Sequence, residues 1–267
     1  MDARALDVVE TRDKALLRDL LAEDPVAAAY LLGDLAPPFF SQCRWLIARY
    51  RGRVEGVVLL YNGLSVPALL TYGAPDAVEA ILDHFAPELP TPCYAKLPLE
   101  HVDAVRSHYR MGDVERLWMM GLRASELTVP DRTHDATPLS KSSALEEIDA
   151  LYADYPGNYF EASQLESGLY YGVHAAGRLV SIAGTHVLAP AEGIAVIGNI
   201  VTSARERRSG FASACTARLV EGLAALGCKT VALQVAADNA AGIACYRNLG
   251  FRFRGVALQT RCERLVD

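Results

Sequence analysis

The sequence lacks any apolar run long enough to cross a membrane, and its start lacks the pattern of a secretion signal. A membrane-spanning helix needs about 20 apolar residues in succession. A signal peptide needs a basic start and an apolar core, whereas Met1 to Glu10 contain acidic residues and no apolar run. We therefore expect a cytoplasmic protein that makes no membrane contact.

Metal-binding and redox patterns of cysteine are also missing. The six cysteines include no C-x-x-C pair, and none stands beside a histidine that could complete a zinc site. Cys215 and Cys245 fall on apolar helix faces, where a buried free thiol is typical. We therefore expect no metal ion, and we expect reduced thiols, as in a cytoplasmic setting.

The sequence has little excess charge of either sign. Residues 1–130 hold 13 basic and 18 acidic residues, residues 131–267 hold 13 and 14, and the formal net charge is −6. A nucleic-acid-binding surface needs a basic patch or stripe, so we expect no nucleic-acid partner. Hydrophobic residues make up 51% of the chain, which is enough to form a real core.

Two halves of similar element order make up the chain, as its length of 267 residues also favours. We place the boundary between residues 128 and 129, inside a segment of weak periodicity that contains Pro130 and Pro138. In the first half the hydrophobic pattern predicts the order α, α, β, β, β, α, β, α, β. The second half repeats much of this order without matching sequence, so a duplication is a hypothesis. Both halves predict a mixed α/β fold, with a short strand near Tyr94 and further strands at 45–50, 54–61, 66–72, 114–122, 169–174, 179–188, 194–202, 230–235 and 251–260.

The most informative stretch is a strand, turn and helix from Asn199 to Leu226. A β-branched run ends at Ser203, a turn with several arginines follows, and Gly210 opens a segment with helical spacing. Free N–H groups at a helix start and the helix dipole favour an anion, and the arginines strengthen this preference. The stretch therefore predicts a phosphate site, although an ordinary solvated turn remains the alternative.

The motif at this turn excludes two common nucleotide sites. Residues 207–212, R-R-S-G-F-A, fit the pattern R/Q-x-x-G-x-G/A, in which small residues allow close approach of a ligand. A Walker A loop would need Gly-Lys-Ser/Thr, and a dinucleotide site would need G-x-G-x-x-G, and neither occurs here. A second motif follows, because Asn239 and Tyr246 stand two helical turns apart on one predicted helix face.

Together these pieces resemble motifs A and B of the GCN5-related N-acetyltransferase (GNAT) superfamily, over residues 137–262. The tandem arrangement is similar to the glycine N-acyltransferase-like branch of that superfamily. The resemblance implies a C-terminal catalytic unit (129–267) that binds acetyl-CoA, or another acyl-CoA, and a degenerate N-terminal unit (1–128). It implies that Asn239 contacts the pantetheine arm and that Tyr246 protonates the departing thiolate. It also implies further cofactor contacts by the β-strand residues Ile200, Val201 and Thr202 and by the turn residues Arg207, Arg208, Ser209, Gly210, Phe211, Ala212 and Ser213.

Some of these residues have plain structural alternatives. Asn239 is a good helix cap, and Tyr246 could be a core aromatic residue. For the base that deprotonates the amine we name Glu161 and His186. Glu161 could equally be a first-turn helix carboxylate, and a lone histidine in an apolar strand is more often a hydrogen-bonded structural residue. Asn199 could face the acceptor or form a bulge in its strand.

We therefore expect an N-acetyltransferase that moves the acetyl group directly to an amine of a small molecule or peptide. No nucleophile with a positioned base is visible in the sequence, so no covalent enzyme intermediate is expected. The first half would shape the acceptor cleft or mediate assembly, for example as a homodimer. The main alternative is a non-catalytic acyl-CoA-binding or sensor protein. A tRNA-dependent aminoacyl transferase is a further alternative, but the acidic first half speaks against it.

Overall fold

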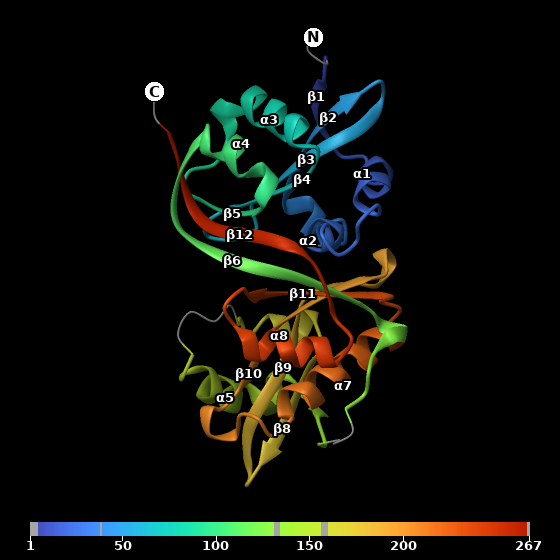
Figure 1. The fold of residues 1–267 in the computed structure, drawn as a ribbon, viewed down its shortest axis with the longest axis vertical. Helices are drawn as coiled ribbons and strands as arrows, with labels where there is room; N and C mark the ends of the chain where they lie inside the picture. Colours follow the sequence, from blue (N-terminus) through green and yellow to red (C-terminus); the bar gives the residue numbers. More distant parts are fainter. Residues whose placement is uncertain (1–4, 38, 131–133, 156–159, 266–267) are drawn as a thin grey trace. The chain divides into compact units, whose positions relative to one another are not determined.

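The structure is a computed structural model that describes residues 5–37, 39–130, 134–155 and 160–265. The chain divides into two compact units, which are described separately (Figure 1). Unit 1 comprises Met1–Met119 and Arg254–Asp267, and unit 2 comprises Met120–Phe253. Within the described ranges, no helix is long and apolar enough to cross a membrane.

Unit 1 is a mixed sheet covered by helices. Its strands follow the order β1-β2-β3-β4-β5-β12; β4 and β5 are parallel and the other neighbours are antiparallel. Figure 1 shows α3 and α4 on one side of this sheet. The strands are β1 (Asp7–Thr11), β2 (Cys43–Tyr50), β3 (Arg53–Tyr61), β4 (Ala68–Gly73), β5 (Cys93–Pro98) and β12 (Arg252–Arg264), and the helices are α1 (Lys14–Leu21), α2 (Ala29–Asp34), α3 (Pro75–His84) and α4 (Val102–Arg106).

The core of unit 1 is formed by apolar side chains that alternate along its strands and point to one face of the sheet. Leu46 and Val58 lie opposite each other on β2 and β3, and both are fully buried in the cluster that α3 completes with Val78 and Ile81. The helix α3 begins at Pro75, which fits a first helical position because proline has no N–H to donate. Burying one apolar side of α3 against alternate strand residues therefore fixes the helix on this face of the sheet.

Unit 2 has the same kind of architecture. Its strands follow the order β11-β10-β9-β8-β7, with β10 and β11 parallel and the other neighbours antiparallel. Tyr170 belongs to the core under α5, whereas the neighbouring Tyr171 contacts α7 at Gly222, so these two helices cover opposite faces. The strands are β7 (Thr137–Pro138), β8 (Tyr170–Ala175), β9 (Arg178–Ala189), β10 (Ile194–Thr202) and β11 (Thr230–Ala236), and the helices are α5 (Lys141–Tyr152), α6 (Gln164–Ser167), α7 (Phe211–Ala225) and α8 (Ala240–Asn248).

The division between the units differs from the boundary at 128/129. It falls between Met119 and Met120, inside the long strand β6 (Tyr109–Arg123), and the C-terminal strand belongs to unit 1. The physical reason is pairing: residues Ala257 to Cys262 of β12 pair antiparallel with Pro98 to Cys93 of β5. The mixed α/β fold class is confirmed, whereas β1 and the first residues of β6 were not expected.

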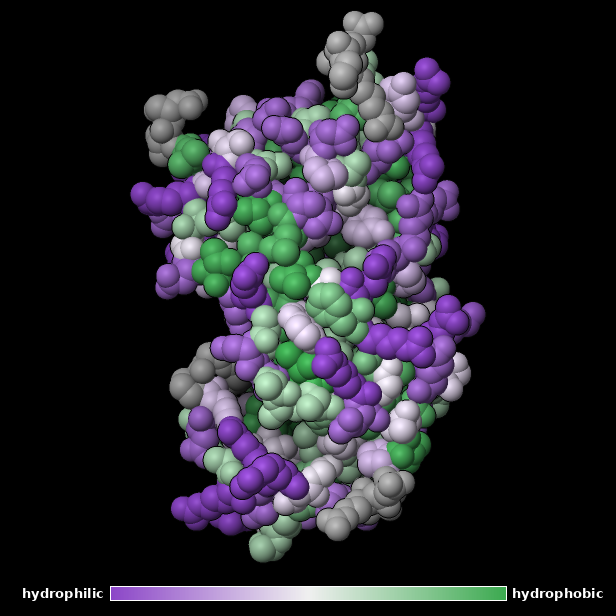
Figure 2. Space-filling model, viewed as in Figure 1, coloured by the Kyte–Doolittle hydropathy of each residue, from purple (hydrophilic) through white to green (hydrophobic). Residues whose placement is uncertain are grey.

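The surface in Figure 2 carries hydrophilic side chains over much of the face shown, with hydrophobic residues between them. Large apolar residues that are exposed are spread along the sequence, as is usual for folded proteins. They are Leu64, Tyr94, Leu99, Val114, Val129, Leu226, Phe253 and Leu265.

Candidate acyl-CoA site in unit 2

The centre of the candidate site is a place where two parallel strands separate. β10 and β11 pair over Ile194 to Ile197 and Thr230 to Leu233, and no pairing between them continues in the described residues beyond this point. On its other side β10 stays paired with β9 as far as Thr202. The remaining backbone of β10 on the β11 side is therefore not used by a neighbouring strand, and an extended ligand can use it instead.

A bulge at Asn199 accompanies this separation. The register between β9 and β10 shifts between Gly198 and Val201, and Asn199 has a positive φ of 52°. Asparagine tolerates this left-handed conformation better than most residues. Its Nδ2 donates to Gln164 Oε1 and to the Tyr170 hydroxyl, both at 2.9 Å, and the Tyr152 hydroxyl donates to its carbonyl at 2.6 Å. The bulge reading of Asn199 is therefore the one that the structure supports.

The arginine turn leads directly into α7. Arg208 and Gly210 both have positive φ, of 66° and 87°, and Gly210 is the N-cap residue of the helix. Within the described chain, no side chain caps this helix start and its first turn holds no acidic residue. The N–H groups of the first turn and the helix dipole therefore remain available to an anion.

His134 supports this turn and was missed by the sequence reasoning. Its Nε2 donates to the carbonyl of Ser209 at 2.7 Å, and its ring centre lies 4.4 Å from that of Phe211. A Cβ added to Gly210 would lie 3.7 Å from His134. The residue lies in the segment of weak periodicity that contains Pro130 and Pro138, where no local pattern points to a contact 75 residues further along the chain.

Arg207 and Tyr155 connect the turn to the end of β10. Arg207 Nη2 donates to the Tyr155 hydroxyl at 3.1 Å, and its guanidinium lies 5.7 Å from the centre of the tyrosine ring. The Tyr155 hydroxyl in turn donates to the carbonyl of Thr202 at 2.7 Å. Thr202 was expected to offer backbone groups to a ligand, and its carbonyl already accepts this one hydrogen bond from the protein.

The α8 helix carries the two residues of the second motif. Asn239 is the N-cap of α8, and its Oδ1 accepts a hydrogen bond from the Gly242 N–H at 2.9 Å. The capping reading of Asn239 is therefore confirmed, and a ligand contact by its Nδ2 stays a prediction. Ser213 Oγ lies 3.2 Å from Cys245 Sγ, which brings the first turn of α7 next to the residue before Tyr246.

Tyr246 lies in the core, with only 8% of the residue exposed, and its ring packs edge-on against Phe251 at 6.0 Å. Burial, together with the neighbouring Cys245, raises the pKa of its phenol well above the ordinary value. The hydroxyl therefore stays protonated at neutral pH, which a proton donor requires. Its packing equally fits a core aromatic residue.

The two candidate bases lie on different elements. Glu161 is exposed, and its backbone N–H donates to Gln164 Oε1 at 3.1 Å, the same oxygen that accepts from Asn199. His186 lies at the register shift of β9, and its ring covers Gly198 so closely that an added Cβ would lie 2.1 Å from it. Both residues therefore lie near the bulge, and a role as base stays a prediction for each.

The remaining candidate residues for cofactor binding lie on β10 and in the first turn of α7. Ile200 and Val201 are half-buried on β10, and Phe211, Ala212 and Ser213 form the first turn of α7. In the described part of the chain, no group of three or more histidine, cysteine or acidic side chains is arranged to hold a metal ion.

Residues 135–251 match the Acetyltransferase (GNAT) family. No curated protein is similar enough in sequence to match. Among solved structures, a GCN5-related N-acetyltransferase from Kribbella flavida superimposes with a TM-score of 0.62 at 20% identity, covering 88% of this chain and 93% of that one. A GCN5-related N-acetyltransferase from Sphaerobacter thermophilus gives 0.61 at 17% identity, covering 100% and 98%. A tandem GNAT protein from the clavulanic acid biosynthesis pathway gives 0.58 at 14% identity, covering 98% and 100%.

The fold of the whole chain is that of tandem GNAT proteins, because the likeness to the tandem structure extends over nearly all of both chains. The family match lies entirely within unit 2. Residues 135–251 therefore form an acetyltransferase (GNAT) family domain, within a chain that has the fold of tandem GNAT proteins. Both the resemblance and the tandem arrangement predicted from the sequence are confirmed.

Proposed function

We propose that unit 2 binds acetyl-CoA, or another acyl-CoA, and transfers its acyl group to an amine of a small molecule or peptide. The observation that supports this most is the separation of β10 from β11 directly before the uncapped start of α7. A strand with a free edge suits the amide groups of a pantetheine arm, and a helix start suits a pyrophosphate. The two features occur in the order that a single extended ligand would need.

The proposed residue roles follow the chemistry of the transfer. The C–S bond of the thioester breaks and a C–N bond forms, so the amine must lose a proton and the departing thiolate must gain one. Tyr246 is the proposed proton donor, because its phenol is protonated and its helix contacts the first turn of α7. Glu161 or His186 is the proposed base, either directly or through water.

Replacing Gly210 by leucine tests the proposed pyrophosphate-binding site. The leucine side chain would cover the N–H groups of the turn, so we expect at least a tenfold loss of CoA affinity in calorimetry. Gly177 offers a matched control, because it also has positive φ (73°), has room for an added Cβ with nothing within 4 Å, and lies in the β8–β9 hairpin. In both variants, placing a residue with a Cβ at a positive φ lowers the stability by a similar amount, about 1–2 kcal/mol. Equal CoA affinity in Gly210→Leu and Gly177→Leu would refute the assignment.

A non-catalytic acyl-CoA-binding protein is the second candidate, and the packed position of Tyr246 favours it. Only the transferase would release CoA from acetyl-CoA when an amine is present, so turnover distinguishes the two proposed functions. Release of CoA from acetyl-CoA, followed with a thiol reagent across amino acids, polyamines, aminoglycosides and peptides, would support the transferase. Tight CoA binding without release in the presence of any amine would support the binding protein.

A further inference from the structure

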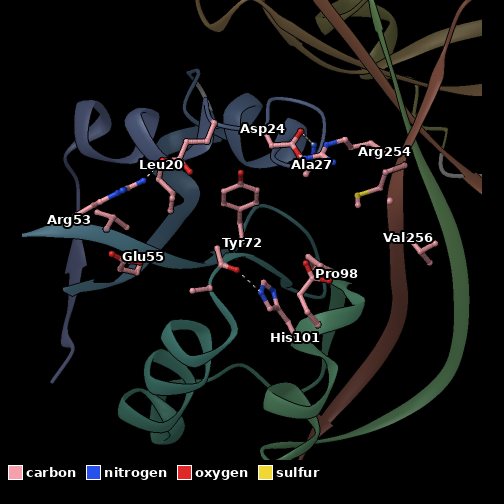
Figure 3. A pocket seen from close by; sticks show the side chains of 17 residues that line it. Leu20, Asp24, Ala27, Arg53, Glu55, Tyr72, Pro98, His101, Arg254 and Val256 are labelled. Carbon is pink, nitrogen blue, oxygen red and sulfur yellow. Dashed lines mark hydrogen bonds and ion pairs between the residues drawn. The ribbon is translucent and has the colours of Figure 1, made fainter. Parts of the chain in front are cut away.

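Unit 1 contains a cavity that the acyl-CoA site does not use. Its volume is about 620 Å³, and it lies between the α1–α2 connection, β3, the end of β4 and the start of β12 (Figure 3). All of its lining residues belong to unit 1. This volume is typical of small-molecule sites, which run from about 300 to 1,000 Å³.

The cavity lies beside the strand pair that corresponds in element order to β10 and β11. Here β4 and β5 pair over Ala68 to Leu70, and beyond that point the His101 side chain is hydrogen-bonded to β4. His101 is fully buried; its Nε2 donates to the Gly73 carbonyl at 3.0 Å, and the Thr71 hydroxyl donates to its Nδ1 at 2.8 Å. Burial lowers the pKa of His101, so the ring is neutral at pH 7 and fits these two bonds. A ligand of this cavity therefore does not insert between the strands.

The described residues around the cavity also form no phosphate-binding site. The helix that begins beside it, α3, starts with Pro75, which has no N–H, and Asp76 occupies its first turn and accepts the Ala77 N–H at 3.0 Å. A Cβ added to Gly73 would lie 2.3 Å from the Glu55 carbonyl oxygen, so the turn before the helix is already packed. An acyl-CoA is therefore a poor ligand for unit 1.

The charges around the cavity favour a cation. Four carboxylates line it, from Glu23, Asp24, Glu55 and Glu100, against two guanidiniums. Both guanidiniums are already engaged: Arg53 bonds Glu23 at 2.7 Å, and Arg254 bonds Asp24. The lining therefore carries a net negative charge and has no cationic group to spare for an anion.

An aromatic side chain stands inside this acidic lining. Figure 3 shows the Tyr72 ring between the Asp24 and His101 sides of the cavity. Its hydroxyl is hydrogen-bonded to the Asp24 backbone, and burial is the main cause that raises its pKa to about 12, so the ring stays neutral and fixed. Leu20, Pro98 and Met119 add apolar surface. A neutral aromatic face with carboxylates around it attracts an ammonium group.

We propose that this cavity is a binding site for a small organic amine in its ammonium form, with an apolar body that packs on Tyr72. The proposal does not depend on the function of unit 2. If unit 2 acylates amines, both units would handle the same chemical class. If it does not, the site in unit 1 stands alone.

Phenethylamine and its neutral isostere 2-phenylethanol test the preference for the ammonium group in the full chain. In calorimetry without CoA, we expect the amine to bind at least tenfold more tightly than the alcohol, and 3-phenylpropanoate not to bind. Equal binding of amine and alcohol, preferential binding of the carboxylate, or no binding of the amine at millimolar concentration would overturn the proposal.

Three variants test whether the amine binds in the cavity of unit 1. Glu100→Gln should weaken amine binding about three- to tenfold, because it removes an exposed carboxylate from the cavity rim without disturbing the core. Glu79→Gln removes a carboxylate on α3 that is also exposed but lies outside the cavity, and it should have no effect. Gly210→Leu in unit 2 should leave amine binding unchanged. Loss of amine binding in Gly210→Leu, or an equal effect of the two glutamine variants, would contradict a site in unit 1.

Discussion

At the scale of single residues, Tyr246 combines deep burial with a protonated phenol, and the two proposed roles of this side chain make different demands. A core aromatic residue needs only the ring, whereas a proton donor needs the hydroxyl. Tyr246→Phe keeps the ring and its contact with Phe251. If the phenol is the acid, the variant should lose about 100-fold in kcat, with CoA affinity changed by less than about twofold.

The pH profile of any turnover by the wild-type protein checks the same assignment. The pKa of Tyr246 is raised above its ordinary value near 10, so the donor stays protonated throughout the neutral and mildly alkaline range. We therefore expect kcat to rise with pH as the amine is deprotonated and not to fall again below about pH 10. Unchanged turnover in Tyr246→Phe would leave Tyr246 with a structural role only.

His134 provides a second residue-scale prediction. Its bond to the Ser209 carbonyl and its contact with Phe211 hold the turn that we propose binds pyrophosphate. One hydrogen bond contributes about 0.5–1.5 kcal/mol net, so His134→Ala should weaken CoA binding about two- to tenfold, and His134→Gln should restore part of it. His174→Ala is the control, because that histidine contacts Glu147 on the β8 side of unit 2. If both alanine variants bind CoA alike, His134 has no part in holding the turn.

At the scale of elements, the bulge of β10 depends on one asparagine that does two things at once. It adopts a positive φ, and its amide bonds both Gln164 and Tyr170. Asn199→Gly keeps the conformation and loses the amide, whereas Asn199→Ala loses both. We expect the alanine variant to be less stable than the glycine variant by about 1 kcal/mol in urea unfolding. Equal stabilities would mean that the backbone at 199 relaxes and that the hydrogen bonds alone hold the bulge.

The sequence predicts the elements of this chain better than their partners. The strand, arginine turn and helix around Gly210 have strong local signals, because β-branched residues, a glycine and helical spacing follow one another. The strand β1 has only two apolar residues, Val8 and Val9, so its hydrophobic pattern is too short to predict a strand. Its extended conformation comes from pairing with β2. His134 and the Tyr155–Thr202 contact were equally invisible, since both join distant parts of the chain.

At the scale of the whole molecule, the last strand illustrates the same difficulty. Its pattern marks β12 as a strand, but nothing local indicates that it pairs with β5 rather than with a strand of the second half. The buried residues of β12, among them Leu258 and Cys262, therefore contribute to the core of unit 1. A chain divided at 128/129 would separate this strand from its partner.

Hydrogen exchange in the full chain tests this assignment of β12. Leu46→Ala removes a fully buried side chain from the core of unit 1, and Ile148→Ala removes one from the core of unit 2, each at a cost of about 2–5 kcal/mol. Amides of residues 257–262 should lose protection together with those of β5 in Leu46→Ala, and should change less in Ile148→Ala. Amides of β9 and β10 should show the opposite pattern, because they share the unit of Ile148. If the amides of 257–262 follow β10 in both variants, β12 opens with unit 2 and the division of the chain described here is wrong.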